Sequence, residues 1–173
     1  MIDIAWADKR ERRKGIKEYI WRFLLFPSFW EDNDKKLPSD LVWNKVLFRT
    51  GNEMSIPSKN GIYCFAVIPP SNIGLFETTY LFYVGKASGT KLRSRYKNYI
   101  NEMNNIGIGE QKPRIKVQEM LNLWYGHIYF YYTVLDDEKS VKNHENTLLN
   151  TFMPYVNTSI PELKISEEYR HIY

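Results

Sequence analysis

A glutamate lies inside the apolar face of a predicted helix near the end of the chain. The segment SVKNHENTLLNTF, residues 140–152, has the periodicity of an amphipathic helix. At about 100° per residue, Glu145 falls among Val141, Leu148 and Leu149 and away from the solvent side. Such a carboxylate either reaches solvent at the edge of the face or requires an arginine, a lysine or a metal ion as its partner.

A second predicted helix, residues 89–103, has an apolar face that is flanked by two arginines. Arg93 and Arg95 lie on opposite flanks of this face, and either side chain could reach a site at the edge of a sheet. Because arginine keeps its charge and offers a planar fork to phosphate oxygens, it suits charge stabilisation and not the role of a base. The apolar positions are Leu92, Tyr96, Tyr99, Ile100 and Met103.

Two tyrosines lie in short apolar triplets on neighbouring predicted strands. The triplets are Gly61-Ile62-Tyr63 and Tyr83-Val84-Gly85, and Pro, Asn and Gly occur between the strands. Strands commonly carry tyrosine, so core packing is one interpretation of these residues. The other is that the two hydroxyl groups face a polar site.

The elements that must position these side chains follow the order strand, strand, helix, helix, strand, helix. We expect strands at 62–68, 80–85 and 127–135, and helices at 89–103, 114–124 and 140–152. The first two strands are apolar on both faces, which predicts a sheet that is covered on both sides. The predicted fold class is α/β (α+β), with a small central, mostly antiparallel three-stranded sheet flanked by helices.

Taken together, these segments resemble the GIY-YIG nuclease family. GIY and YVG match the two signature triplets, and YVGKASGTKLRSRYKNY is similar to the family's pattern of a triplet, a short loop and an arginine-bearing helix. HENTLLNTFMPYVNT resembles the family's glutamate-bearing helix, which is followed by a proline and an asparagine. The resemblance covers about residues 58–158 and implies a GIY-YIG-like fold.

The resemblance implies a role for each matching residue. Tyr63 would be the general base or would orient the attacking water, and Tyr83 would belong to the same hydrogen-bonded cluster. Arg95 would contact the scissile phosphate, although a count from Tyr83 selects Arg93 in some members. Glu145 would be the only carboxylate ligand of a single divalent metal, Mg²⁺ or Mn²⁺. The other matches are Lys86 after the second triplet, Tyr99 where the family has His or Tyr, and Asn157 after the last helix.

Two features depart from the family or restrict its chemistry. The loop between the triplets is longer than in the family, and so is the link from Gly85 to Leu92. A tyrosine is a poor base at its reference pKa of about 10, so nearby cations would have to lower the pKa of Tyr63. Lys86, Arg95 and the metal are the expected sources of that effect.

Positive charge is concentrated in one stretch of the chain. Residues 86–116 contain eight Lys or Arg and two Glu, whereas the whole chain has a net charge of +4. Charge alone fits a solvated helix face, and with the resemblance it predicts binding to the DNA backbone. The expected nucleic-acid contacts are Lys91, Arg93, Lys97, Lys112, Arg114 and Lys116.

The amino-acid composition excludes several classes of protein. A hydrophobic fraction of 43% and a charged fraction of 25% exclude a disordered or membrane protein. Because Cys64 is the single cysteine, internal disulfides and cysteine-rich zinc sites are excluded. We expect its side chain to be buried. We also expect the protein to be cytoplasmic and to have no membrane partner. One active site per chain would favour a homodimer for cutting both DNA strands.

We divide the chain into an N-terminal extension (1–57), a nuclease-like domain (58–158) and a C-terminal tail (159–173). The extension contains a basic amphipathic helix at 8–26, which Pro27 would end. This helix could pack on the main domain, lie along nucleic acid or rest on a membrane surface. For the whole chain, the hypotheses are a metal-dependent DNA endonuclease, a non-catalytic nucleic-acid-binding module of the same fold, and a structural domain with core tyrosines.

Overall fold

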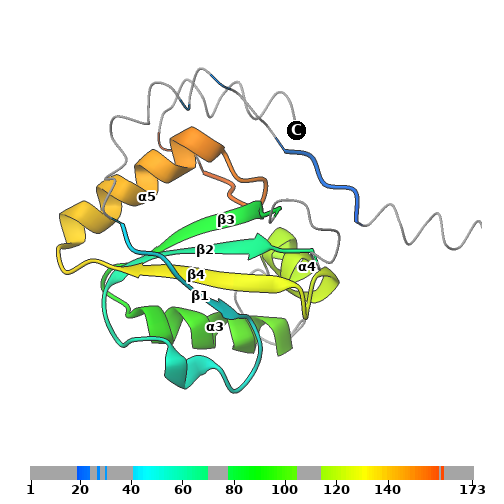
Figure 1. Cartoon of the computed structure of the whole chain (residues 1–173), viewed down its shortest axis with the longest axis horizontal. Coiled ribbons are helices and arrows are strands. Elements are labelled where there is room, and N and C mark those ends of the chain that lie inside the picture. The colour runs from blue at the N-terminus through cyan, green and yellow to red at the C-terminus, as the bar shows by residue number, and fades with distance from the viewer. Residues whose placement is uncertain are drawn as a thin grey trace, which may run out of the picture.

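The computed structural model describes residues 19–23, 27, 30, 41–69, 78–104, 114–159 and 161. These residues form an α+β fold, in which helices surround a four-stranded antiparallel sheet (Figure 1). The strands lie in the order β1-β4-β2-β3. The elements are β1 (Asn44–Leu47), η1 (Glu53–Ser55), β2 (Gly61–Val67), β3 (Tyr80–Ala87), α3 (Leu92–Asn104), α4 (Ile115–Leu123), β4 (Ile128–Val134) and α5 (Glu138–Phe152). The predicted order of the last six strands and helices is confirmed.

The sheet contains a strand that the sequence pattern did not predict. β1 pairs with β4, and Asn44 lies opposite Tyr132. The prediction of a three-stranded sheet is therefore wrong by one strand. β1 is only four residues long, its first two residues are exposed, and it follows the exposed Val42 and Trp43, so it lacks the alternation of a half-buried strand. These residues had been assigned to the N-terminal extension, yet they belong to the sheet.

Both faces of the sheet are covered, as the apolar strands predicted. All seven residues of β2 are buried. Tyr63 and Phe65 pack with α3 and α4 on one face, whereas Ile62 and Cys64 pack with α5 on the other. Figure 1 shows α5 and α3 on opposite sides of the strands. Residues that alternate along β2 and β3 thus face two different helical layers.

A β-bulge changes the alternation in β3. The pairing of β2 with β3 shifts between Phe65 and Ala66, so that Phe82 is an extra residue between the partners Leu81 and Tyr83. As a result, the consecutive residues Phe82 and Tyr83 both pack into the cluster on the α3 side. The bulge places two neighbouring aromatic side chains on the same face of an edge strand.

The part of the N-terminal segment that the structure describes packs on the sheet but is not helical. Residues 20–23 have no helical assignment, which contradicts a continuous helix over 8–26, and Pro27 is itself helical instead of ending a helix. Trp21 packs edge-on against Phe82 and Trp124, with ring centroids 4.9 and 4.6 Å apart. Packing on the main domain is therefore the arrangement that these residues adopt.

Several predicted features lie outside the described residues. They include residues 1–18, most of the loop between the triplets (70–77), Lys112, and most of the tail after 159. Within the described part of the chain, no helix is long and apolar enough to cross a membrane.

Candidate active site

Two buried tyrosine hydroxyls meet between β2 and α3. The hydroxyl groups of Tyr63 and Tyr99 are 3.0 Å apart, and both side chains are almost fully buried. The ring of Tyr83 lies beside both, with centroids 6.3 Å from Tyr63 and 6.1 Å from Tyr99. The three predicted tyrosines therefore form one cluster.

The glycine of the second triplet makes room for this cluster. Gly85 is paired with Tyr63 across the two strands. A Cβ atom on Gly85 would lie 2.6 Å from both Cζ and the hydroxyl oxygen of Tyr63. The Tyr63 ring thus occupies the space that any larger residue at position 85 would need, which gives the glycine a packing role.

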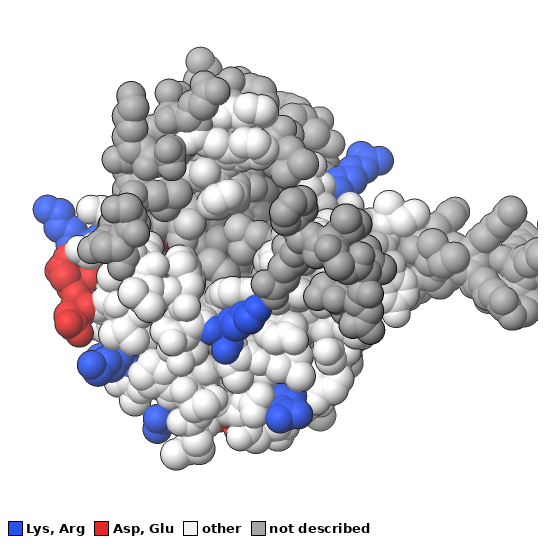
Figure 2. Space-filling model, viewed as in Figure 1, with Lys and Arg blue, Asp and Glu red and all other residues white. Residues whose placement is uncertain are grey.

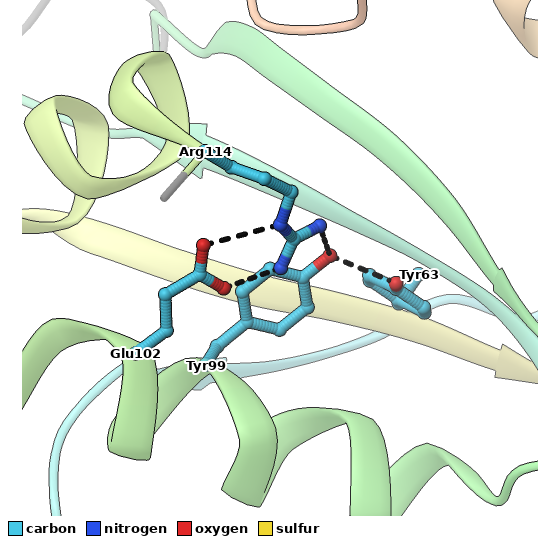
Figure 3. Close-up of polar contacts among 4 residues, drawn as sticks. All are labelled: Tyr63, Tyr99, Glu102 and Arg114. Carbon is cyan, nitrogen blue, oxygen red and sulfur yellow. Dashed lines mark hydrogen bonds and ion pairs between the residues drawn. The ribbon is translucent and has the colours of Figure 1, made fainter. Parts of the chain in front are cut away.

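A third polar group reaches the hydroxyl pair from the start of α4. Arg114 Nη1 donates to the Tyr99 hydroxyl at 3.4 Å, and its guanidinium carbon lies 4.9 Å from the centre of the Tyr99 ring. Arg114 is held by Glu102, which accepts from Nε at 3.1 Å and from Nη2. Figure 3 shows the resulting chain from Glu102 through Arg114 and Tyr99 to Tyr63. Arg114 was expected to contact the DNA backbone only, so its contact with the tyrosines is a residue role that the sequence pattern missed.

The surroundings keep the tyrosines protonated. Burial raises the pKa of Tyr63, and the neighbouring Tyr83 raises it further, while Arg95 and Arg114 lower it by less. Burial likewise raises the pKa of Tyr83 and of Tyr99. The lowered pKa that base catalysis by Tyr63 requires is therefore not provided by the side chains around it. A protonated hydroxyl can instead orient a partner by donating or accepting a hydrogen bond.

We expect the free energy of unfolding to fall as the pH rises above about 10, the value at which tyrosines ionise in the unfolded chain. Because Tyr63 has a raised pKa in the fold, its contribution is complete below the unfolded pKa and is lost as the pH rises toward the folded value. In Tyr63→Phe this loss should be smaller by up to about 1.4 kcal/mol per pH unit. Urea unfolding at several pH values checks this, and equal slopes in the two proteins would contradict it.

Glu145 and Lys86 form an ion pair on the opposite side of β3. Lys86 Nζ donates to Glu145 Oε2 at 2.5 Å. The Glu145 side chain is only 13% exposed, so the prediction that it lies within the apolar face of its helix is confirmed. The partner that its burial demanded is a lysine in this structure. The start of α5 is capped by Asp137, which accepts from the backbone N–H of Ser140 at 2.7 Å.

A cleft of about 740 Å³ brings the two groups together at the free edge of β3. Tyr83 reaches it from the tyrosine cluster, and Lys86 and Glu145 reach it from the other face. Its walls are formed by the first turn of α4, by α5 and by the segment that follows α5. The charged residues that line it are Lys86, Arg114, Lys116, Lys142 and Glu145, so four cations surround one carboxylate. This arrangement suits a phosphate group.

Lys142 is a cleft residue that was not predicted. It lies three residues before Glu145 on α5 and lines the same cleft. Residues at this spacing share one side of a helix, so the sequence contained a usable signal. The predicted basic stretch ended at residue 116, and for that reason it did not include this lysine.

The two candidate arginines of α3 differ in how they are bonded. Arg93 Nε donates to the backbone oxygen of Ile56 at 2.8 Å, which ties α3 to the residue after η1. Arg95 Nε is buried and has no hydrogen-bond partner among the described residues. Arg95 is also one of the cations that lower the pKa of Tyr63. Only Arg95 thus combines proximity to the tyrosines with an unused donor, although it does not line the cleft.

The remaining predicted nucleic-acid contacts are spread over the surface. Lys91 Nζ donates to Asn60 at 3.0 Å, and Lys97 is exposed on α3. Lys116 lies in the cleft wall, with its ammonium group 4.2 Å from the centre of the Tyr155 ring. In the view of Figure 2 the basic side chains are separated and do not form one continuous patch. The structure therefore brings Arg114 and Lys116 of this set to the cleft.

Asn157 closes part of the edge of β3. Its amide accepts from the N–H of Val84 at 2.9 Å and donates to the carbonyl of the same residue at 2.8 Å. Val156 adds a backbone hydrogen bond to Phe82 at 3.1 Å. Asn157 lines the cleft. Both ends of its amide are used to hold β3, which makes it a positioning residue.

The cleft offers one carboxylate as a possible ligand for a metal ion among its described lining residues. This carboxylate belongs to Glu145, and nowhere in the described ranges do three or more His, Cys, Asp or Glu form a potential metal cluster. Zn²⁺ sites use three or four such ligands, whereas Mg²⁺ is often held by one or two carboxylates with water and phosphate oxygens. Lys86 competes for the same carboxylate oxygen.

The comparisons with known proteins add no relative. No family model matches this chain, and neither a curated protein nor a solved structure matches it. The fold and the site by themselves define the chain as an α+β protein with a basic cleft at the edge of its sheet.

Proposed function

We propose that this protein is a metal-dependent endonuclease that hydrolyses DNA phosphodiester bonds at a GIY-YIG-type site. The observation that carries the proposal is the cleft at the edge of β3, where Tyr83, Lys86, Arg114 and Glu145 meet. These residues come from segments that are far apart in the sequence. A cationic cleft with one carboxylate and a tyrosine hydroxyl contains the group types that phosphodiester hydrolysis requires.

Each group has a distinct task in this proposal. Arg114, Lys116 and Lys142 bind the DNA backbone in the cleft. Arg95 has a buried Nε with no partner among the described residues and does not line the cleft, so its contact with the scissile phosphate requires its side chain to move. Tyr83 orients the attacking water at the cleft, because Tyr63 is too deeply buried to reach it without a rearrangement. Tyr63 and Tyr99 hold the cluster in place through their 3.0 Å contact.

Glu145 would hold Mg²⁺ or Mn²⁺. When bound, such an ion supplies charge neutralisation at the phosphate and polarises water. Lys86 is the residue that neutralises Glu145 in the structure, so binding of a cation requires the ammonium group to leave Oε2. Lys86 would then be available to the negative charge of the phosphate in the same cleft.

We expect Arg95→Ala to lower the single-turnover rate of DNA cleavage by about 10²- to 10³-fold, the usual loss when one group that stabilises transition-state charge is removed. The matched variant Arg93→Ala should instead lose about 1 kcal/mol of stability, because it removes the hydrogen bond to Ile56. Cleavage of labelled DNA and urea unfolding of both variants measure the two effects. The reverse assignment, with the larger rate loss in Arg93→Ala, would transfer the phosphate contact to that residue.

The Lys86–Glu145 ion pair favours a second candidate function. A lysine that permanently neutralises the one carboxylate among the described lining residues of the cleft would make this a non-catalytic nucleic-acid-binding module. The experiment that separates the two is a cleavage assay on supercoiled, linear and branched DNA with Mg²⁺ or Mn²⁺, run beside a binding assay at several salt concentrations. Cleavage supports the endonuclease, whereas salt-dependent binding without cleavage supports the binding module.

A further inference from the structure

A second cavity lies at the other end of α4 from the basic cleft. It has a volume of about 360 Å³ and lies between the N-terminal segment, the start of β3 and the end of α4. Several of its rings remain open to solvent, with Tyr19 52% and Tyr80 43% exposed. The aromatic residues that line it are Tyr19, Trp21, Phe23, Tyr80, Phe82 and Trp124. We call this cavity the aromatic pocket.

The aromatic pocket and the basic cleft are neighbours along β3, although none of the described residues lines both. Because of the β-bulge, Phe82 of the pocket and Tyr83 of the cleft are consecutive residues on the same face of β3. Tyr155 links the two sites from the outside, since its ring lies 4.2 Å from the ammonium group of Lys116 and 5.0 Å from the ring of Trp21. A ligand that bridges the two sites would have to lie along α4 and pass Tyr155.

A basic residue lies beside the aromatic pocket in the sequence. Exposed Arg22 lies between two of its lining residues in the sequence, and His127 lines it. Its described lining residues include no carboxylate. Aromatic rings beside a cationic groove are the combination by which proteins bind unpaired nucleotides, with bases stacked on the rings and phosphates in the groove.

We propose that the aromatic pocket binds an unpaired nucleobase of the same DNA strand whose phosphates lie in the basic cleft. This inference rests on the proposed function and specifies its substrate class: DNA with unpaired nucleotides beside the cut, such as a branched or flapped molecule. A base that is paired in a duplex has its faces covered by its neighbours and cannot stack on these rings. The pocket therefore selects for a single-stranded arm.

The length of α4 sets the distance between the base and the cut. The helix covers the nine residues Ile115–Leu123, with Arg114 at the cleft and Trp124 at the pocket. At a rise of about 1.5 Å per residue, the two sites are on the order of 14 Å apart. This corresponds to about four nucleotides at a stacked spacing of about 3.4 Å.

The test measures how tightly the full-length protein binds labelled DNA without added metal. Three kinds of DNA are compared: a duplex, a flapped duplex, and a series of flapped duplexes that each carry one abasic nucleotide at a successive position. We expect the flapped molecule to bind about tenfold or more tightly than the duplex. An abasic nucleotide about four positions from the junction should remove that preference. The variants Tyr19→Ala and Tyr80→Ala should bind the flapped molecule about tenfold more weakly and the duplex unchanged.

Tyr125→Ala is the matched control, because Tyr125 is 50% exposed at the same end of α4 but does not line the pocket. It should behave like the unmodified protein on all three DNA molecules. Equal affinity for duplex and flapped DNA, or an unchanged preference in both pocket variants, would overturn the pocket proposal even if the protein cleaves DNA. A preference for flapped DNA that depends on the pocket, in a protein that cleaves none of the molecules, supports the pocket and rejects the endonuclease.

Discussion

Glu145→Gln should lower metal-dependent DNA cleavage by about 10³-fold while the protein remains folded. The substitution keeps the shape of the side chain and an oxygen that can accept from Lys86, but it removes the only carboxylate among the described residues of the cleft. Single-turnover cleavage with Mg²⁺ and with Mn²⁺ measures the loss. Binding of DNA without metal should be retained or strengthened, since the cleft loses a negative charge.

Glu119→Gln provides the control for this prediction. Glu119 is exposed on α4 and does not line the cleft, so the same chemical change there should leave cleavage unaltered. If Glu145→Gln cleaves DNA as well as the unmodified protein does, Glu145 is only a structural partner of Lys86. The burial of its side chain would then be explained by the ion pair alone.

Gly85→Ala should destabilise the protein by about 1–3 kcal/mol, as extra atoms in a packed core usually do. Its Cβ would lie 2.6 Å from two atoms of the Tyr63 side chain, and no such contact is tolerated without movement. The Tyr63 ring must therefore shift away from Gly85, which breaks the 3.0 Å contact between its hydroxyl and that of Tyr99. We expect a lower free energy of unfolding in urea together with a lower rate of cleavage.

A double-mutant cycle with Tyr63→Ala identifies the cause. Once the ring is removed, a methyl group at position 85 has room, so Gly85→Ala should then cost much less than in the unmodified protein. The expected coupling energy between the two positions is about 1–3 kcal/mol. Additive effects within about 0.5 kcal/mol would show that the loss arises from the backbone and not from contact with Tyr63.

The elements of the fold could be predicted where the hydrophobic pattern was strong. Both faces of β2 are buried and α3 buries Leu92, Tyr96, Tyr99 and Ile100, so periodicity alone located these elements. β1 could not be found in this way, because a short strand with exposed residues at the edge of a sheet has no pattern of its own. Its position depends on pairing with β4, which is a tertiary contact.

Some residues that line the cleft were among those singled out from the sequence, but the contacts between them could not be predicted. Helical periodicity correctly placed Glu145 on an apolar face, but it left an arginine, a lysine or a metal ion as possible partners. Only the fold brings Lys86 Nζ within 2.5 Å of Glu145 Oε2. Helical periodicity did not distinguish Arg93 from Arg95. In the structure, the backbone carbonyl of Ile56 accepts a hydrogen bond from Arg93. The contact of Arg114 with Tyr99 joins two helices and has no local signal.

The way in which Asn157 bonds to Val84 has a consequence for the solubility of the protein. An uncovered edge strand is a template on which another chain can add a strand, and this is a common route to aggregation. Asn157 occupies both backbone groups of Val84, and Val156 occupies the carbonyl of Phe82, in the middle of β3. The middle of this sheet edge is thereby closed to pairing with a second copy of β3.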